Sequence, residues 1–130
     1  ESLPAMTWEE REPMWDSRVI DHGFGAVAQK NTWLRESRAL VEGEPLTPFL
    51  RAAVAADFTN PFANSGDQGL QFVNADITLY LHRLPAGEWL GFQVVAHHAS
   101  EGVAVGECVM YDVAGPIGRS TVCGVANVRR

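Results

Sequence analysis

Residues 50–62, LRAAVAADFTNPF, set the architecture, because they belong to the one convincing helix in the chain. Thr47 is a suitable N-cap, and Pro48 follows at the first helical position, where its missing N–H costs nothing. The dipeptide Asn60-Pro61 is expected to end the element. The pattern therefore predicts a single helix of about 12–14 residues.

An aspartate lies where the apolar stripe of this helix should continue. Helical spacing places Leu46, Leu50, Ala53 and Asp57 on one face, which we expect to face the core. Burial and the negative helix C-terminus both disfavour a charged carboxylate, which predicts a raised pKa and a better base. The alternative is an aspartate that caps the following turn, FTNP, and position alone favours this second interpretation.

The residues after the helix are predicted to form long strands. Residues 63–69 form a turn-rich loop, and residues 70–84 then alternate between two faces. The alternation places Val73, Ala75, Ile77, Leu79 and Leu81 on one face, and Asn74, Asp76, Thr78, Tyr80 and His82 on the other. Further strands are expected over 89–100, 103–112 and 117–130, after a turn at 85–88.

The order of elements indicates the fold class. Residues 1–15 are expected to be a lead-in, 16–37 contain strand-like pieces, and 39–45 form a loop. Strands, one helix and a long antiparallel meander together predict an α+β layer architecture in a single domain, 16–130. The hotdog fold, in which a sheet wraps around one helix, fits this order.

Composition excludes several classes of protein. The chain has 130 residues and a net charge of −6, with nine Arg and one Lys, Lys30. Such an acidic chain is a poor candidate for non-specific nucleic-acid binding. No apolar run approaches the roughly 20 residues of a membrane span. Two cysteines, Cys108 and Cys123, are too few for a disulfide framework, and no CxxC occurs.

Several segments resemble the C-terminal hotdog of the acyl-CoA thioesterase II (TesB-like) family. They are AADFTNPF at 55–62, FVNADITLYLHRLPAGEWLGF at 72–92 and GECVMYDVAGPIGRSTV at 106–122, with WLRES at 33–37 and GEPLTPFLR at 43–51. Members of the family typically carry two hotdog halves in one chain, and this chain resembles the second half. The resemblance implies a second hotdog as partner, either in the same chain or in a homodimer.

The resemblance also implies a catalytic trio. The family's carboxylate ends the helix, which is Asp57 here, and its threonine position is occupied by Asn74. The family's glutamine follows the ST of the last strand, where this chain has Cys123. The implied chemistry is hydrolysis of an acyl-CoA thioester by a water that Asp57 activates and Asn74 holds, without a cofactor or a metal ion. Such an enzyme would act in cytoplasmic lipid metabolism, and the cysteine at 123 predicts slow turnover.

Several other polar residues are candidates for the site, and their positions on the predicted strands limit what they can contact. His82 and Arg83 end a strand and are candidates to contact the phosphates of coenzyme A. The adjacent His97 and His98 should point to opposite faces of their strand, so they are not expected to bind one metal ion. Ser120 lacks the GxSxG context of a nucleophile.

Two rival functions remain open at this point. The first is a non-catalytic acyl-CoA-binding or structural half of a hotdog assembly, which the cysteine at 123 favours. The second is a hotdog hydratase or dehydratase, which needs an Asp–His pair that the helix does not supply.

The cysteines allow a prediction of register. A turn centred on Ala114-Gly115 would pair Gly106 with Cys123, and Cys108 with Thr121. Both cysteines would then be diagonal neighbours on one face, about 7–8 Å apart, a distance that is marginal to too far for an unstrained disulfide. We therefore expect two free thiols, and the family resemblance implies that the thiol of Cys123 lies close to Asp57.

Overall fold

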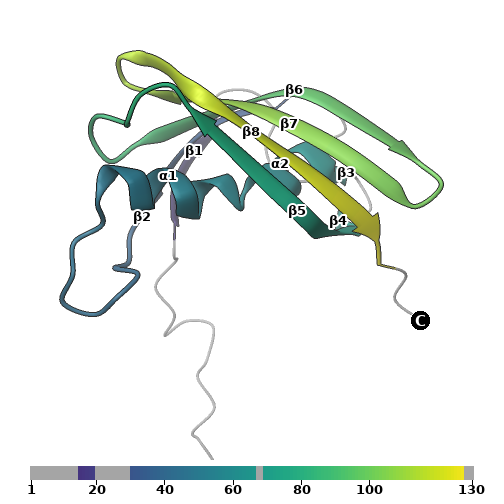
Figure 1. The fold of residues 1–130 in the computed structure, drawn as a ribbon, viewed down its shortest axis with the longest axis horizontal. Helices are drawn as coiled ribbons and strands as arrows, with labels where there is room; N and C mark the ends of the chain where they lie inside the picture. The colour runs from purple at the N-terminus through teal and green to yellow at the C-terminus, as the bar shows by residue number, and fades with distance from the viewer. Residues whose placement is uncertain (1–14, 20–29, 67–68, 128–130) are drawn as a thin grey trace, which may run out of the picture.

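The computed structural model describes residues 15–19, 30–66 and 69–127, and two helices in it lie against one face of a curved sheet (Figure 1). The six strands of the antiparallel sheet are β1 (Trp15–Val19), β2 (Asn31–Glu36), β5 (Phe72–Leu81), β6 (Leu90–Ser100), β7 (Val103–Asp112) and β8 (Gly115–Ala126). The helices are α1 (Pro48–Ala56) and α2 (Thr59–Asn64), and a short hairpin follows them, β3 (Ser65–Gly66) with β4 (Gly69–Leu70). The expected α+β architecture is thereby confirmed, and of the lead-in only Trp15 lies within the described residues.

The strand order corrects the predicted meander. The sheet runs β1-β2-β6-β7-β8-β5, so of the four strands predicted to form the meander only β6, β7 and β8 follow one another in the sheet. β5 pairs with β8 rather than with β6, its neighbour in the chain. Residues 82–89 therefore cross the ends of β8 and β7 before β6 begins. The crossing leaves β5 at the edge of the sheet (Figure 1).

The predicted single helix is divided in two. Thr47 caps α1 as expected, accepting a hydrogen bond from the N–H of Leu50 at 3.2 Å, with Pro48 at the start of the helix. The helix ends at Ala56, and α2 begins at Thr59, after two intervening residues. The prediction that Asn60-Pro61 ends the helix is wrong, because the proline lies in the first turn of α2, where no intrahelical N–H donor is needed.

Small residues bring the helices close to the sheet. The sheet-facing positions of α1 are Ala52, Ala55 and Ala56, all buried. A Cβ atom at Gly106 of β7 would overlap that of Ala63 in α2, so glycine is required at this contact. The core is completed by the buried hydrophobic residues Leu34, Phe62, Leu90, Phe92, Val94, Cys108, Met110 and Ile117.

A buried lysine fastens the C-terminal end of α2. The Nζ of Lys30 donates to the carbonyls of Phe62 and Ser65, both at 2.7 Å, and to Ser65 Oγ at 2.8 Å. Lys30 is 2% exposed, and burial lowers its pKa. Three acceptors match the three N–H groups of an ammonium, and a positive charge at a helix C-terminus is stabilised by the helix dipole. Lys30 is therefore an anchor between β2 and the helix layer.

The cysteine register differs from the prediction by one residue. Gly106 pairs with Val122 and Cys108 pairs with Ser120, because the register shifts between Met110 and Tyr111 and the hairpin turn lies at Val113-Ala114. Cys108 and Cys123 therefore lie on opposite faces of the sheet, not on one face. Both are free thiols, as expected, and burial raises the pKa of the Cys108 thiol to about 12.

Candidate active site

Asp57 follows the last residue of α1, and its side chain is exposed in this chain. The expectation of a buried aspartate is wrong, because the helix turns a different face to the sheet. Ala52, Ala55 and Ala56 are buried, whereas Leu50 and Ala53 are only half-buried. The stripe that ends in Asp57 thus lies along the side of the helix layer.

A β-bulge brings Asn74 to this aspartate. The register between β5 and β8 shifts between Asn74 and Asp76, so Ala75 is the extra residue. The shift turns Asn74 to the helix side of the sheet, opposite to the face predicted by strict alternation. There its Nδ2 donates to Asp57 Oδ1 at 3.0 Å. Two residues of the predicted trio are therefore in direct contact.

Cys123 does not join this pair. It pairs with Asp76 on the outer face of the sheet. Its neighbours in β8, Ser120 and Val122, are buried beneath the helices, and the Oγ1 of Thr59 donates to Ser120 Oγ at 2.6 Å. Because side chains alternate along a strand, Cys123 faces away from the helices and from Asp57. The predicted proximity of its thiol to the carboxylate is not observed.

The guanidinium of Arg83 has a structural partner. Its two terminal nitrogens donate to Asp112 at 2.5 and 2.6 Å, and Nη2 also donates to the carbonyl of Gly115 at 3.1 Å. Asp112 also accepts from the N–H groups of Ala86 and Ala114. The Arg83 guanidinium holds the pKa of the buried Asp112 carboxyl well below its usual range.

This ion pair joins two of the segments that carry the family resemblance. His82-Arg83 and Tyr111-Asp112 meet where residues 82–89 cross the β7–β8 hairpin, so Arg83 and Asp112 hold the crossing in place. The expected phosphate contact through Arg83 has no geometric support, because both terminal nitrogens are used within the fold. The His82 side chain is exposed just after β5, and the backbone N–H of His82 donates to the carbonyl of Ile117 at 3.0 Å.

A chain of buried amides under α2 ends at a histidine, a connection that the sequence did not reveal. Asn64 Nδ2 donates to Asn60 Oδ1 at 2.8 Å, and Asn64 Oδ1 lies 2.8 Å from Nδ1 of His97. Asn64 Oδ1 is an acceptor, so His97 carries its proton on Nδ1. Burial, together with the charges of Lys30 and His98, lowers the pKa of His97.

The expected opposite orientation of the adjacent histidines is confirmed. His97 pairs with Gly106 on the helix side of the sheet, and His98 pairs with Val105 on the outer side. The partner of His97 is in α2, whereas that of Asp57 is Asn74. The described residues thus contain no Asp57–histidine pair of the kind that a hydratase would use. They also contain no group of three His, Cys, Asp or Glu side chains able to hold a metal ion.

Comparisons with known proteins define the class of fold. The chain is similar to the tesB protein of Mycobacterium avium subsp. paratuberculosis, with 15% identity, TM-score 0.68, and coverage of 98% of this chain and 53% of that one. It is also similar to the acyl-CoA thioesterase II TesB2 of Mycobacterium marinum, with 20% identity, TM-score 0.65, and coverage of 99% and 57%. A candidate thioesterase from Syntrophus aciditrophicus matches with 12% identity, TM-score 0.65, and coverage of 88% and 85%. The fold is therefore the hotdog fold of thioesterases.

The sequence identifies the family. The model of the acyl-CoA thioesterase C-terminal domain matches residues 2–123, and this chain belongs to that family. It spans about half the length of the two TesB structures. Among curated protein sequences, none matches the chain. Within the described residues, no helix is long and apolar enough to cross a membrane.

Proposed function

We propose that this domain hydrolyses acyl-CoA thioesters with a water molecule that Asp57 activates. The observation that carries the proposal is the hydrogen bond from Asn74 to Asp57 at the end of α1, formed through a bulge in β5. Bulges that re-aim a side chain are over-represented beside active sites. Family membership supplies the substrate class, because the matching model is that of an acyl-CoA thioesterase domain.

The proposed reaction needs one base and one nucleophile. Asp57 Oδ2 takes a proton from water as the water oxygen attacks the thioester carbonyl carbon. The tetrahedral intermediate then expels the thiolate of coenzyme A, and the proton on Asp57 passes to that sulfur. Asn74 holds Oδ1 of the carboxylate, which leaves Oδ2 to face the water. The products are a free acid and free coenzyme A.

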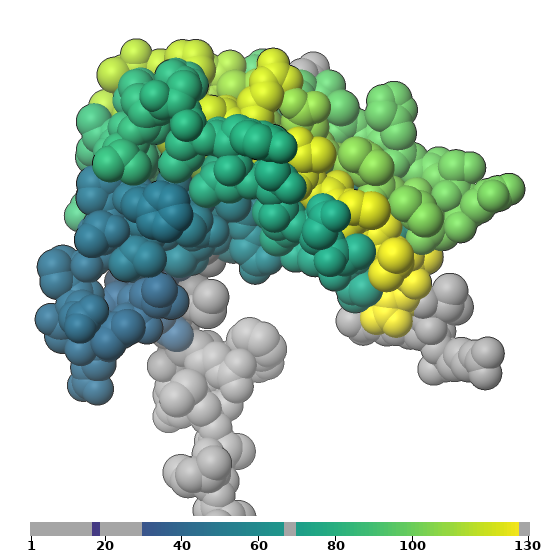
Figure 2. Space-filling view, viewed as in Figure 1, coloured from purple at the N-terminus to yellow at the C-terminus, as the bar shows by residue number. Residues whose placement is uncertain are grey.

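The site would be completed by a second hotdog. β5 is an edge strand, and the side of α1 that ends in Asp57 is only partly covered. In Figure 2 the teal atoms of β5 lie uncovered along the front of the molecule. A second hotdog placed against this edge would enclose Asp57 and exclude bulk water.

The free thiols are consistent with the reducing cytoplasm, where we place the protein.

Turnover of acyl-CoA tests this function. Release of free thiol from a panel of acyl-CoA substrates of different chain lengths should be measured with a colorimetric thiol reagent. Asp57→Asn should abolish turnover, because an amide cannot accept the proton. The matched control is Asp76→Asn, which alters an exposed carboxylate on the outer face and should leave the rate unchanged. Turnover that persists in Asp57→Asn would rule out the proposed base.

The position of Cys123 favours a second candidate function, a non-catalytic acyl-CoA-binding half. No glutamine is present at this family position, and the thiol that replaces it faces away from Asp57. Acyl-CoA would then bind to the chain without turnover. If the chain is inactive and Cys123→Gln gives it turnover, the missing glutamine is the reason for the inactivity.

A further inference from the structure

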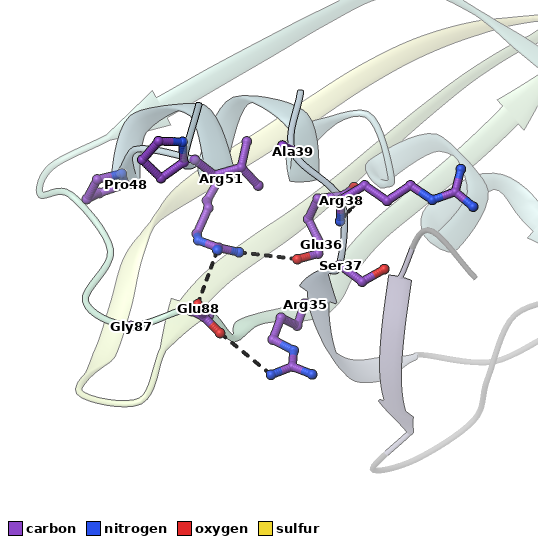
Figure 3. A pocket seen from close by; sticks show the side chains of 11 residues that line it. Arg35, Glu36, Ser37, Arg38, Ala39, Pro48, Arg51, Gly87 and Glu88 are labelled. Atoms are coloured by element: carbon purple, nitrogen blue, oxygen red, sulfur yellow. Dashed lines mark hydrogen bonds and ion pairs between the residues drawn. The ribbon is translucent and has the colours of Figure 1, made fainter. Parts of the chain in front are cut away.

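A basic pocket lies at the opposite end of α1 from Asp57 (Figure 3). Its volume is about 620 Å³, and it lies between the loop that follows β2 and the turn at residues 85–88. Arg35, Arg38 and Arg51 contribute three positive charges, against the two negative charges of Glu36 and Glu88. A net positive pocket is notable in a chain whose net charge is −6.

Two of these arginines converge on one carboxylate. Arg51 Nη2 lies 3.4 Å from Glu88 Oε1, and Arg35 Nη1 lies 3.6 Å from Glu88 Oε2. Figure 3 shows both guanidinium groups directed at Glu88, while Arg38 extends away from them. Well-formed pairs of this type are about 2.7–2.9 Å long. Glu88 therefore bridges the two arginines loosely.

The arginines are less exposed than the carboxylate. The Arg51 side chain is 14% exposed and that of Arg35 is 39% exposed, and Arg51 Nη1 also donates to the carbonyl of Glu36 at 3.5 Å. The Arg35 guanidinium lies 5.3 Å from the centre of the Trp89 ring, a cation–π contact. By contrast, the Glu88 side chain is 57% exposed on a turn beside Gly87, whose φ is +76°. An external anion can thus displace Glu88 without rebuilding the basic wall.

The remaining wall of the pocket is apolar. Pro45, Leu46 and Pro48 line it, and side chains of this kind pack against the face of a planar ring. A phosphorylated nucleoside has two parts that such a pocket can bind: a phosphate, which pairs with arginines, and a planar base, which packs against apolar side chains. We propose that this pocket binds the 3′-phosphorylated adenosine end of coenzyme A, with Arg35 and Arg51 on phosphate and Glu88 as the group it displaces.

The proposal rests on the proposed thioesterase function and predicts how acyl-CoA would be oriented along α1. α1 has nine residues and separates the pocket from Asp57 by about 14 Å. The nucleotide would lie at the N-terminal end of the helix, and the extended pantetheine arm would carry the thioester towards Asp57. Arg51 thus takes the role that the sequence suggested for Arg83, whose guanidinium is paired with Asp112.

Direct binding of adenosine 3′,5′-bisphosphate tests the pocket without any reaction. By isothermal titration calorimetry, Arg51→Gln should weaken binding about tenfold or more, as expected for loss of a charge-assisted contact. Glu88→Gln should tighten binding several-fold, because it removes the competing carboxylate. The matched controls are Arg119→Gln and Glu107→Gln, which alter an ion pair on the outer face of the sheet and should have no effect.

The opposite signs of the two substitutions separate ligand binding from a structural role. Weaker binding in Glu88→Gln, or no response to Arg51→Gln, would overturn the proposal. Inorganic phosphate and adenosine should be titrated separately. Equal affinity for phosphate alone would contradict the nucleoside part of the assignment.

Kinetics distinguish failure of the pocket from failure of the thioesterase function. Arg51→Gln should raise KM for acyl-CoA about tenfold, with a much smaller effect on an S-acyl-N-acetylcysteamine thioester, which lacks the nucleotide. If bisphosphate binds as expected but neither thioester is hydrolysed, the function is wrong and the pocket stands. If both thioesters are hydrolysed with equal sensitivity to Arg51→Gln, the pocket assignment is wrong.

Discussion

Asp112 shows how a single residue can carry a long-range connection. Its carboxylate is buried, and it accepts hydrogen bonds from Arg83 and from the backbone at Ala86 and Ala114. These donors come from three parts of the chain: the end of β5, the crossing to β6, and the β7–β8 hairpin. A buried carboxylate that loses its cation retains the desolvation penalty without compensation.

Arg83→Gln should therefore destabilise the fold. We expect a larger loss in the free energy of unfolding at pH 7 than for an exposed ion pair, because the buried Asp112 carboxylate would be left without its cation. The pKa of Asp112 is lowered in the folded state, so its contribution is complete above about pH 4 and is lost as the pH falls further. Urea unfolding at a series of pH values should show that the difference in the free energy of unfolding between Arg83→Gln and the unsubstituted chain becomes smaller below about pH 4. The exposed pair is the control: Arg119→Gln should cost less than about 1 kcal/mol.

Asn74 should affect catalysis rather than stability. Asn74→Ala removes the donor to Asp57, and we expect kcat to fall about tenfold with little change in KM. Asn74→Thr, the family's residue, should retain more of the rate because it keeps a hydroxyl. Steady-state kinetics of thiol release measures both. Equal rates for Asn74→Ala and the unsubstituted chain would remove Asn74 from the site.

The elements are placed by contacts that the local sequence does not encode. The start of α1 was predictable because Thr47 and Pro48 act within one turn, and the bounds of β7 were predicted correctly from alternation and flanking turns. The bulge at Ala75 was not predictable, because an extra residue is defined only against the partner strand. For the same reason the pattern alone gave the wrong face for Asn74, whereas the family resemblance placed it beside Asp57.

The helix also shows where sequence reasoning stopped. Its apolar residues allowed more than one buried face, and the choice was made by the sheet, which accepts only small side chains at this distance. The pocket arginines come from β2, the following loop and α1, so no spacing along the chain connects them. They became visible only when the elements were assembled.

Contact between α2 and β7 predicts a steric effect. In Gly106→Ala the new methyl group would overlap Ala63 Cβ and lie 2.8 Å from Asn64 Oδ1. We expect a loss of about 1–3 kcal/mol in the free energy of unfolding, as for other overpacked cores. Ala63→Gly should cost about 1 kcal/mol alone but should relieve the double variant. Chemical denaturation of the four proteins measures this cycle, and simple additivity would argue against the clash.

At the scale of the whole molecule, the edge strand β5 presents exposed hydrophobic side chains at one end of the sheet. Val73 is 45% exposed and Tyr80 is 68% exposed, and the strand pairs with β8 on one side only. Such an edge in a sheet promotes pairing with another strand. It also borders the proposed site, so assembly and catalysis would share one surface.

We expect this chain to form a homodimer in solution. Light scattering after size-exclusion chromatography should give a mass near twice 14.2 kDa. Tyr80→Lys and Val73→Lys, which add charge to the edge strand, should shift the mass towards that of the monomer. The control is Val113→Lys, at an exposed turn residue outside β5. A monomer at all concentrations would contradict pairing of this chain with itself.

The anchor formed by Lys30 makes the chain unusual towards amine-modifying reagents. Lys30 is the sole lysine, and in the fold its Nζ is buried and bonded to three oxygen atoms. An N-hydroxysuccinimide ester added to the folded chain should therefore acylate the terminal α-amine alone. Under denaturing conditions a second adduct should appear, and intact-mass spectrometry would count it. The rate at which Lys30 is labelled thus reports how often the fold opens locally, since the amine must leave the end of α2 before it can react.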